Sequence, residues 1–352
     1  MNDRATETAV AGDGAPGSGA GARAMATLAR IVARPWVRAI APLLFVLLVG
    51  LIFNAHGTFY QWGTHRDMLR QVSVYGILAS GLTLVIISGG IDLSVGSVLG
   101  MSAVLFATLS LHLGWSAWLA IPAALLAGAG GGLLSGGLIA RFRLQPFIAT
   151  LAVMVFCRGL AKFISGGQKV SQAVQQADGS YKYLDLPAFY GLIDRKLLWN
   201  NVAVVTLIFL ACVAVCWVLL ARLRWGRYLY ATGGNEEAAR LSSVPTSAMK
   251  LLAYGLSGLL AGVAGVCQAV QEQQGDPEAG TTYELTAIAI VVMGGTSLNG
   301  GRGGMLFTLL GAMTIGYLEK ILSINAVGEA SRLMLTGGII VAAVLFQKVR
   351  RA

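Results

Sequence analysis

The chain has 352 residues, of which 56% are hydrophobic and only 12% are charged, and its formal net charge is +10. This composition excludes an ordinary soluble domain, because a soluble core of that size does not need so much apolar surface. The basic residues are dispersed at the ends of apolar runs and do not form a stripe with stacking aromatics, so we expect no nucleic-acid partner. The composition therefore predicts an integral membrane protein in contact with lipid.

Apolar runs close to the length that crosses a hydrocarbon core of about 30 Å fill most of the chain. They lack the period-2 alternation of outer-membrane strands, so the sequence predicts an all-α membrane protein. Several runs are short or rich in glycine, and one of them could be re-entrant. We expect about ten spans, at 39–55, 71–88, 94–112, 115–140, 146–164, 200–221, 249–270, 284–298, 304–323 and 332–347.

Arginine and lysine gather in alternate connections, as at 141–143 and 222–250, whereas the connection at 271–283 carries acidic residues and no base. Positive charge is retained on the cytoplasmic side, so we expect both termini to be cytoplasmic. The first residues are rich in Ala and Gly and are typical of a disordered tail. We therefore predict a disordered basic cytoplasmic tail at 1–38, a transmembrane domain at 39–347 and a short cytoplasmic tail at 348–352.

The stretch SGGIDLSVGS, beginning at Ser88, places one carboxylate inside an otherwise apolar region. An ionisable group at membrane depth costs about 2.5–3.5 kcal/mol, so it must face protein or water. We expect Asp92 to accept hydrogen bonds from the exposed amides at the start of the next helix. Direct contact with a solute and proton coupling are the alternatives. The candidate residues of this segment are Gly89, Gly90, Asp92, Ser94 and Gly96.

A second glycine-rich segment, 294–304, again joins two predicted spans. Two similar breaks in the two halves of a chain are typical of an internally duplicated transporter, which stays a hypothesis here. Glycines at spacing four in 128–136, and again at 258 and 262, predict closely packed helices within the subunit. The candidate residues of the second segment are Gly294, Gly295, Thr296, Ser297 and Asn299.

The longest predicted inner loop, 222–248, contains a short helix with well-defined ends. Two glycines break the chain before it, Asn235 suits its N-cap, and acidic and basic residues suit its first and last turns. It is a solvated surface helix or a docking element for a soluble partner. The candidate residues for docking are Gly233, Gly234, Asn235, Glu236, Glu237 and Arg240.

No phosphate-binding GxxxxGK[ST] loop occurs, so ATP hydrolysis, where it is needed, belongs to another chain. The cysteines all lie inside apolar runs, where they are expected to be buried hydrophobic residues. No HExxH or CxxC spacing appears, so we expect no metal site, no cofactor bound by this chain and no catalytic residue.

Four segments together resemble the permease subunits of bacterial ABC importers for monosaccharides of the ribose, galactose and xylose type. They are SGGIDLSVGS, LQPFIATL, GRYLYATGGNEEAARLS and YELTAIAIVVMGGTSLNGGRGG, which follow one another along the chain. The resemblance covers about 71–347. The tail before residue 39 and the outer loop that starts at Gly166 depart from the family pattern.

The resemblance implies the ABC importer permease fold in the bacterial inner membrane and a path for a monosaccharide. It also implies the partners: ATPase subunits that use ATP and Mg, a second permease copy or close paralogue, and a periplasmic sugar-binding protein. The short helix after Asn235 would then be the coupling helix that seats in a groove of the ATPase.

Three alternatives remain. A proton-coupled secondary transporter acting alone would use Asp92 or Glu284, but such transporters are expected to pair ionisable residues at mid-depth. An ABC permease for another cargo, including a non-sugar cargo, has the same motifs. An integral membrane enzyme needs a clustered nucleophile, base or metal site, which the sequence does not offer.

Overall fold

The computed structural model describes residues 35–335 apart from 177, 200 and 329, together with 337, 338 and 341. The predicted terminal tails lie outside these residues, except for the last part of 1–38, which belongs to the first described helix. Most of the predicted span at 332–347 also lies outside them.

Within the described residues, seven helices are long and apolar enough to cross a membrane. Two of the other predicted spans are shorter apolar helices, so the prediction of about ten spans is confirmed only for these seven. The seven are α3 (Trp62–Ile87), α4 (Val95–Ala107) continued by the π-helical η2 (Thr108–His112), α5 (Ala117–Phe142), α6 (Pro146–Ser165), α8 (Val204–Arg222), α11 (Thr246–Glu272) and α13 (Met305–Ile324). The shorter ones are the apolar part of α2 (Pro35–Ile52) and α12 (Tyr283–Met293).

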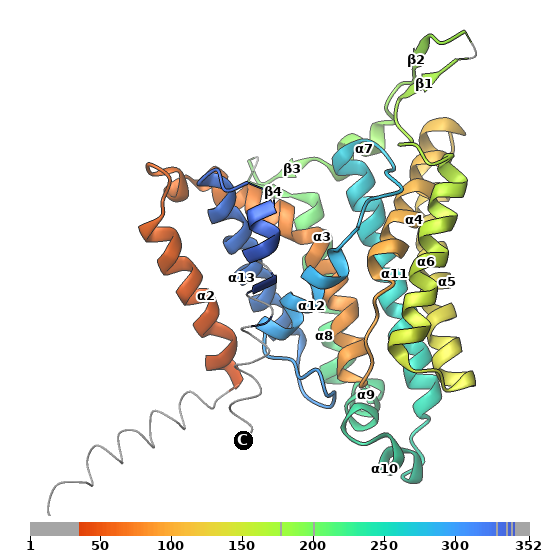
Figure 1. Cartoon of the computed structure of the whole chain (residues 1–352), viewed down its shortest axis with the longest axis vertical. Helices are drawn as coiled ribbons and strands as arrows, with labels where there is room; N and C mark the ends of the chain where they lie inside the picture. The colour runs from red at the N-terminus through yellow and green to blue at the C-terminus, as the bar shows by residue number, and fades with distance from the viewer. Residues whose placement is uncertain are drawn as a thin grey trace, which may run out of the picture.

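Small elements lie at the two ends of the helix bundle (Figure 1). Helices α9 (Arg224–Gly234) and α10 (Glu236–Leu241) occupy one end, and two short antiparallel strand pairs belong to the other. The all-α prediction did not include these strands, which form outside the membrane-spanning helices. The remaining elements are η1 (Thr58–Tyr60), β1 (Ala173–Gln175), β2 (Tyr181–Tyr183), α7 (Ala188–Ile193), β3 (Lys196–Leu197) and β4 (Val202–Ala203).

Helix α11 lies at the centre of the bundle, where it packs against α3, α4 and α5. Its contact with α5 is made by glycines: a Cβ on Gly128 would lie 2.6 Å from the Gly258 carbonyl oxygen, and a Cβ on Gly258 would lie 2.6 Å from the Gly132 nitrogen. Small residues let helix backbones approach closely in a membrane. The predicted close packing of these glycines within one subunit is confirmed.

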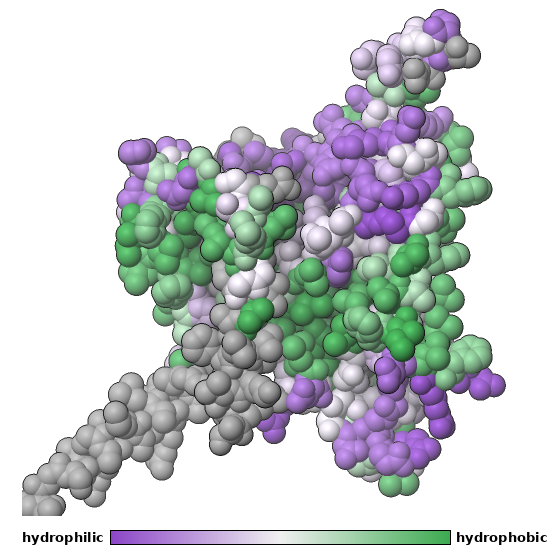
Figure 2. Space-filling view, in the orientation of Figure 1, coloured by the Kyte–Doolittle hydropathy of each residue, from purple (hydrophilic) through white to green (hydrophobic). Residues whose placement is uncertain are grey.

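The surface follows the arrangement of the helices. Figure 2 shows apolar residues around the middle of the molecule and hydrophilic residues gathered at the strand-bearing end and on α10. Strongly exposed apolar side chains lie on α5, α6 and α8, for example Leu126, Phe156 and Val215. These faces suit contact with lipid.

Candidate functional site

Three glycine-containing segments that are far apart in the sequence meet at the end of the bundle that carries α10. A Cβ on Gly300 would lie 2.6 Å from the Gly233 carbonyl oxygen and 2.9 Å from the Gly89 Cα. The Gly301 amide donates to the Ile87 carbonyl oxygen over 2.9 Å. Gly89 and Gly300 have positive φ angles of 85° and 80°, which favour glycine. The junction therefore needs glycine both for its backbone conformation and for its close contacts.

A pocket of about 320 Å³ opens beside this glycine junction. It brings together predicted residues from all three segments, which sequence reasoning had placed in separate motifs. Tyr254 and Lys250 of α11 close one side of it. Its predicted members are Gly89, Gly90, Gly233, Gly234, Asn235, Glu236 and Asn299.

Helix α10 has the ends that the sequence predicts. The Asn235 side chain accepts a hydrogen bond from the Ala238 amide over 2.9 Å, as an N-cap does. Arg240 pairs with Glu237 at 2.6 Å on the exposed face, and Leu241 is 78% exposed. An exposed leucine at the tip of a rigid, capped helix suits insertion into a groove of a partner.

The two glycines that precede α10 differ from the prediction. Gly233 and Gly234 do not break the chain before α10; they are the last residues of α9, which was not expected. Helix α9 is held by tertiary contacts, such as the bond from the Tyr230 hydroxyl to the Gly303 carbonyl oxygen, 2.9 Å. These contacts outweigh the low helix propensity of glycine.

Lys250 links α10 to the central helix α11. Its Nζ lies 2.6 Å and 2.7 Å from the two carboxylate oxygens of Glu236, and its side chain is only 19% exposed. Further along α11, the Tyr254 hydroxyl donates to the Ile91 carbonyl oxygen over 3.2 Å. Helix α11 therefore contacts both the surface helix and the first glycine-rich segment.

Asp92 is buried, with 1% of its surface exposed. Its Oδ1 accepts hydrogen bonds from the Ser94 amide and hydroxyl, at 3.0 Å and 2.5 Å, and its Oδ2 accepts one from the Ser257 hydroxyl of α11 at 3.0 Å. Ser94 is the N-cap residue of α4, so the carboxylate closes the turn that precedes the helix. Asp92 thus ties α4 to α11 through hydrogen bonds.

The predicted residues of the second glycine-rich segment do not all lie at the pocket; one packs against α13. Of its predicted residues, only Asn299 lines the pocket. Gly294 packs under α13, where a Cβ on Gly311 would lie 2.9 Å from the Gly294 nitrogen. The remaining three, which lie between α12 and Asn299, are Gly295, Thr296 and Ser297.

Gly96, in the first turn of α4, does not line the pocket and contacts a different segment. It packs against Gly280, in the connection between α11 and α12. A Cβ on the neighbouring Gly100 would lie 2.6 Å from the Ala279 carbonyl oxygen. The connection 273–282 therefore descends along α4, and α12 begins where this contact ends.

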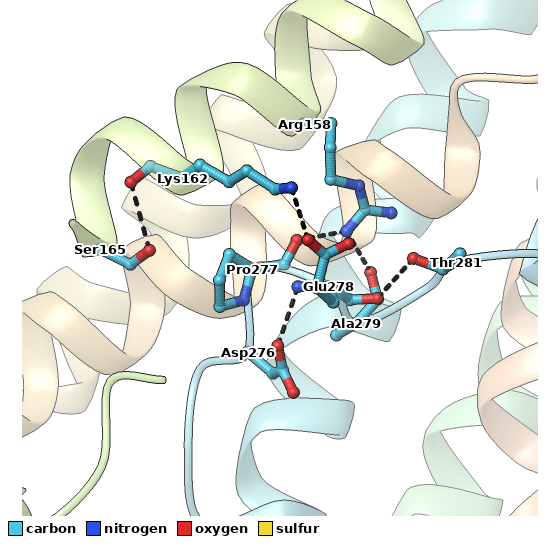
Figure 3. A network of polar contacts seen from close by, with 8 residues as sticks. All are labelled: Arg158, Lys162, Ser165, Asp276, Pro277, Glu278, Ala279 and Thr281. Atoms are coloured by element: carbon cyan, nitrogen blue, oxygen red, sulfur yellow. Dashed lines mark hydrogen bonds and ion pairs between the residues drawn. The ribbon is translucent and has the colours of Figure 1, made fainter. Parts of the chain in front are cut away.

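Basic side chains on α6 hold this connection in place (Figure 3). Arg158 donates to the carbonyl oxygens of Pro277 and Ala279, the second over 2.8 Å. Lys162 pairs with Glu278 at 2.6 Å. Both bases come from one face of α6 and point toward the connection in Figure 3.

A further ion pair, between Lys169 and Asp276 at 3.0 Å, holds the start of the same connection. The hydrogen bond to Asp276 raises the pKa of the Lys169 ammonium group. The Val170 amide donates to the Gly275 carbonyl oxygen, and the Gly275 amide donates to the Val170 carbonyl oxygen, each over 2.8 Å. Sequence reasoning missed this set of contacts. The spacing of Arg158 and Lys162 by one helical turn, opposite an acidic loop without bases, was the signal available.

Comparison with known proteins places this arrangement in a family. Residues 65–344 match the family model described as branched-chain amino acid transport system / permease component. The ribose import permease protein RbsC of Escherichia coli K12 is 37% identical over 300 residues, which are 85% of this chain and 90% of the relative. No solved structure matches.

Two further relatives are transport permeases. The L-arabinose transport system permease protein AraH of Escherichia coli K12 is 32% identical over 80% of this chain and 81% of its own length. The fructose import permease protein FrcC of Rhizobium meliloti is 32% identical over 87% and 84%. The chain is therefore a multi-pass membrane transport component, not itself catalytic, and it belongs to this family of ABC importer permeases.

Proposed function

We propose that this chain forms the translocation path for a neutral monosaccharide in an ATP-driven importer of the bacterial inner membrane. The observation that carries the proposal is α10, a capped helix that projects from the bundle directly beside the glycine junction (Figure 1). A rigid element in that place can pass the movement of a soluble motor to the membrane part.

The cargo is inferred from the relatives. Their names include ribose, L-arabinose and fructose, whereas the family description names branched-chain amino acids. Identities of 32–37% over most of both chains favour a sugar. The proposed partners are ATPase subunits that use ATP and Mg, a second permease copy or close paralogue, and a periplasmic binding protein that delivers the sugar.

The distribution of charge supports an orientation with α10 and both chain termini in the cytoplasm. Arg222, Arg224 and Arg227 flank the start of α9, on the α10 side of the bundle. The opposite end carries Asp276 and Glu278 in the connection after α11. Cytoplasmic loops carry the excess of basic residues.

The contacts of α11 suggest how the movement of α10 reaches the path. A displacement of α10 pulls on Lys250 through Glu236, and α11 then acts through Tyr254 and Ser257 on the segment that contains Ile91 and Asp92. That segment positions the start of α4. A shift of this segment therefore moves α4 against the connection 273–282, which packs along it. The chain supplies the path, and the partner supplies the energy.

Reconstitution tests the cargo. Proteoliposomes that contain this chain with its ATPase and binding protein, and ATP on the ATPase side, are supplied with radiolabelled D-ribose, L-arabinose, D-fructose or leucine. We expect accumulation of at least one sugar and none of leucine. Accumulation of leucine alone would contradict the proposed cargo.

A further inference from the structure

Residues of four helices, α3, α11, α12 and α13, form a polar cluster. Tyr75 of α3 and Tyr283, the first residue of α12, have ring centroids 4.5 Å apart. Gln268 of α11 donates to Glu272 over 2.5 Å, and its amide acts electrostatically on the Tyr283 phenol. Glu319 of α13 interacts electrostatically with both phenols. We call these five residues the tyrosine cluster.

The tyrosine cluster lies near one boundary of the membrane part. The apolar run of α3 begins at about residue 71, after Arg66, Asp67 and Arg70, so at about 1.5 Å per residue Tyr75 lies ~6 Å inside that run. A hydrocarbon core is about 30 Å thick, so Tyr75 lies within it but nearer to one boundary than to its middle. Tyr283 is at the same depth, because it packs against Tyr75.

The cluster is partly open at its surface. Gln268 is buried, but Tyr75, Tyr283 and Glu319 are only partly buried, and Glu272 is exposed. Carboxylates and amides do not face lipid, because a polar group without partners in hydrocarbon costs several kcal/mol. The open side of the cluster must therefore face water or protein, and a translocation path that opens at this end of the bundle meets that requirement.

We propose that the tyrosine cluster is a contact site for a neutral, polyhydroxylated solute in the translocation path. The chemistry fits such a solute. Aromatic rings offer apolar faces to the C–H groups of a sugar ring, while carboxylate and amide oxygens accept hydrogen bonds from its hydroxyls. The inference rests on the proposed function, and it names residues that the family comparison does not assign.

The charges of the cluster disfavour other cargo. Glu272 and Glu319 repel an anion, and the cluster itself contains no base to pair with the carboxylate of an amino acid. Arg332 acts on Glu319 from outside the cluster and offsets part of its charge. Because the contacts are few and the site is partly open, binding is weak, which lets the solute move on.

Cysteine labelling tests whether the cluster faces the path. The complete importer is reconstituted with Cys157, Cys212, Cys216 and Cys267 replaced by serine, and with Tyr283→Cys or Val215→Cys added. Val215, 67% exposed on α8, is the lipid-facing control. We expect a hydrophilic, membrane-impermeant thiol reagent to modify Tyr283→Cys about ten times faster, and the imported sugar to slow the reaction during turnover. Equal rates for the two variants, or no effect of the sugar, would overturn the inference.

Conservative variants in the otherwise native chain give a second measurement. Tyr75→Phe and Tyr283→Phe should each lower sugar uptake about tenfold and change the ratio of uptake rates between D-ribose and L-arabinose, while ATPase stimulation by the loaded binding protein stays unchanged. Tyr181→Phe, on the exposed strand β2, is the matched control and should change nothing.

The results separate the inference from the proposed function. A wild-type importer that accumulates none of the tested sugars overturns both. A wild-type importer that accumulates a sugar, with Tyr75→Phe and Tyr283→Phe lowering uptake and ATPase activity together, overturns the contact site alone, because that result marks the tyrosines as structural.

Discussion

The ammonium group of Lys250 on α11 lies 2.6 Å from the Glu236 carboxylate on α10, which joins the surface helix to the most central helix of the bundle. The same face of α11 carries Tyr254 and Ser257, which bond to the segment before α4. A movement of α10 by one partner can therefore reach the middle of the membrane through one rigid element.

Reversal of this ion pair tests the link. Glu236→Lys alone should lower ATP-driven sugar uptake several-fold, because it places two positive charges together at a half-buried contact. The double variant Glu236→Lys with Lys250→Glu should restore most of the uptake. Uptake in both variants is measured in proteoliposomes with the ATPase present. A double variant as impaired as the single one would show that the ion pair does not transmit the movement.

Two neighbouring glycines of α9 should respond differently to alanine. A Cβ on Gly233 would collide with the backbone of Ile87 and Gly301, whereas nothing lies within 4 Å of a Cβ on Gly234. Gly233→Ala should therefore destabilise the protein by about 1–3 kcal/mol. Gly234→Ala is the matched control and should be neutral. Thermal unfolding of the purified protein in detergent checks both, and equal effects would contradict the glycine junction.

Asp92→Asn should keep both folding and transport. The amide oxygen still accepts from Ser94, and the Ser257 hydroxyl can turn to accept from the new amide group. Asp92→Ala leaves the buried Ser94 amide without its acceptor and should cost about 1–3 kcal/mol of unfolding free energy. Thermal unfolding and uptake are measured for both variants. Loss of transport in a stable Asp92→Asn protein would assign a transport role to the negative charge.

The exposed Leu241 should anchor α10 to the ATPase. Leu241→Asp should weaken the ATPase complex by about 2 kcal/mol, which is roughly a thirtyfold loss of affinity, because a buried apolar anchor becomes a charge. Co-purification and titration of the ATPase in detergent measure this loss. Glu237→Ala and Arg240→Ala, which remove the exposed pair beside it, should uncouple ATP hydrolysis from uptake while membrane insertion stays intact. Normal ATPase binding by the Leu241→Asp variant would argue against α10 as the element that docks on the ATPase.

The connection 273–282 should depend on Arg158 more than on its salt bridges. Arg158→Ala removes the donor to two backbone carbonyls at partly buried positions, and should cost about 1–3 kcal/mol. Glu278→Gln removes only an exposed ion pair and should cost less than about 1 kcal/mol. Unfolding midpoints of the two variants test the difference. A larger drop in the unfolding midpoint with Glu278→Gln than with Arg158→Ala would show that the ion pair, and not Arg158, holds the connection seen in Figure 3.

The sequence predicted elements whose causes are local. Helix α10 was placed correctly because an N-cap residue, acidic residues and a final base lie next to one another at Asn235–Leu241. Helix α9 was missed, because its glycines are poor helix formers and its support comes from Tyr230 and the distant Gly303. Local propensity gives way where tertiary contacts hold the backbone.

For the candidate sites as well, the sequence predicted local features but not contacts between distant segments. Asp92 was singled out because a carboxylate in an apolar run is costly wherever the chain folds. Its partner Ser257, the contact between Gly96 and Gly280, and the bonds from Arg158 join segments far apart in the sequence. No periodicity or spacing in a single sequence identifies such pairs. The tyrosine cluster, and the contacts of the basic residues of α6 with the connection 273–282, can therefore be recognised only in the structure.

The most direct test of the account measures sugar accumulation by purified components in proteoliposomes with a collapsed proton gradient. With the ATPase, the loaded binding protein and ATP present, this chain should accumulate sugar against its gradient, and it should accumulate none when the ATPase is left out. Uphill uptake by this chain alone, driven by an imposed proton gradient, would contradict a permease that is moved by its partner.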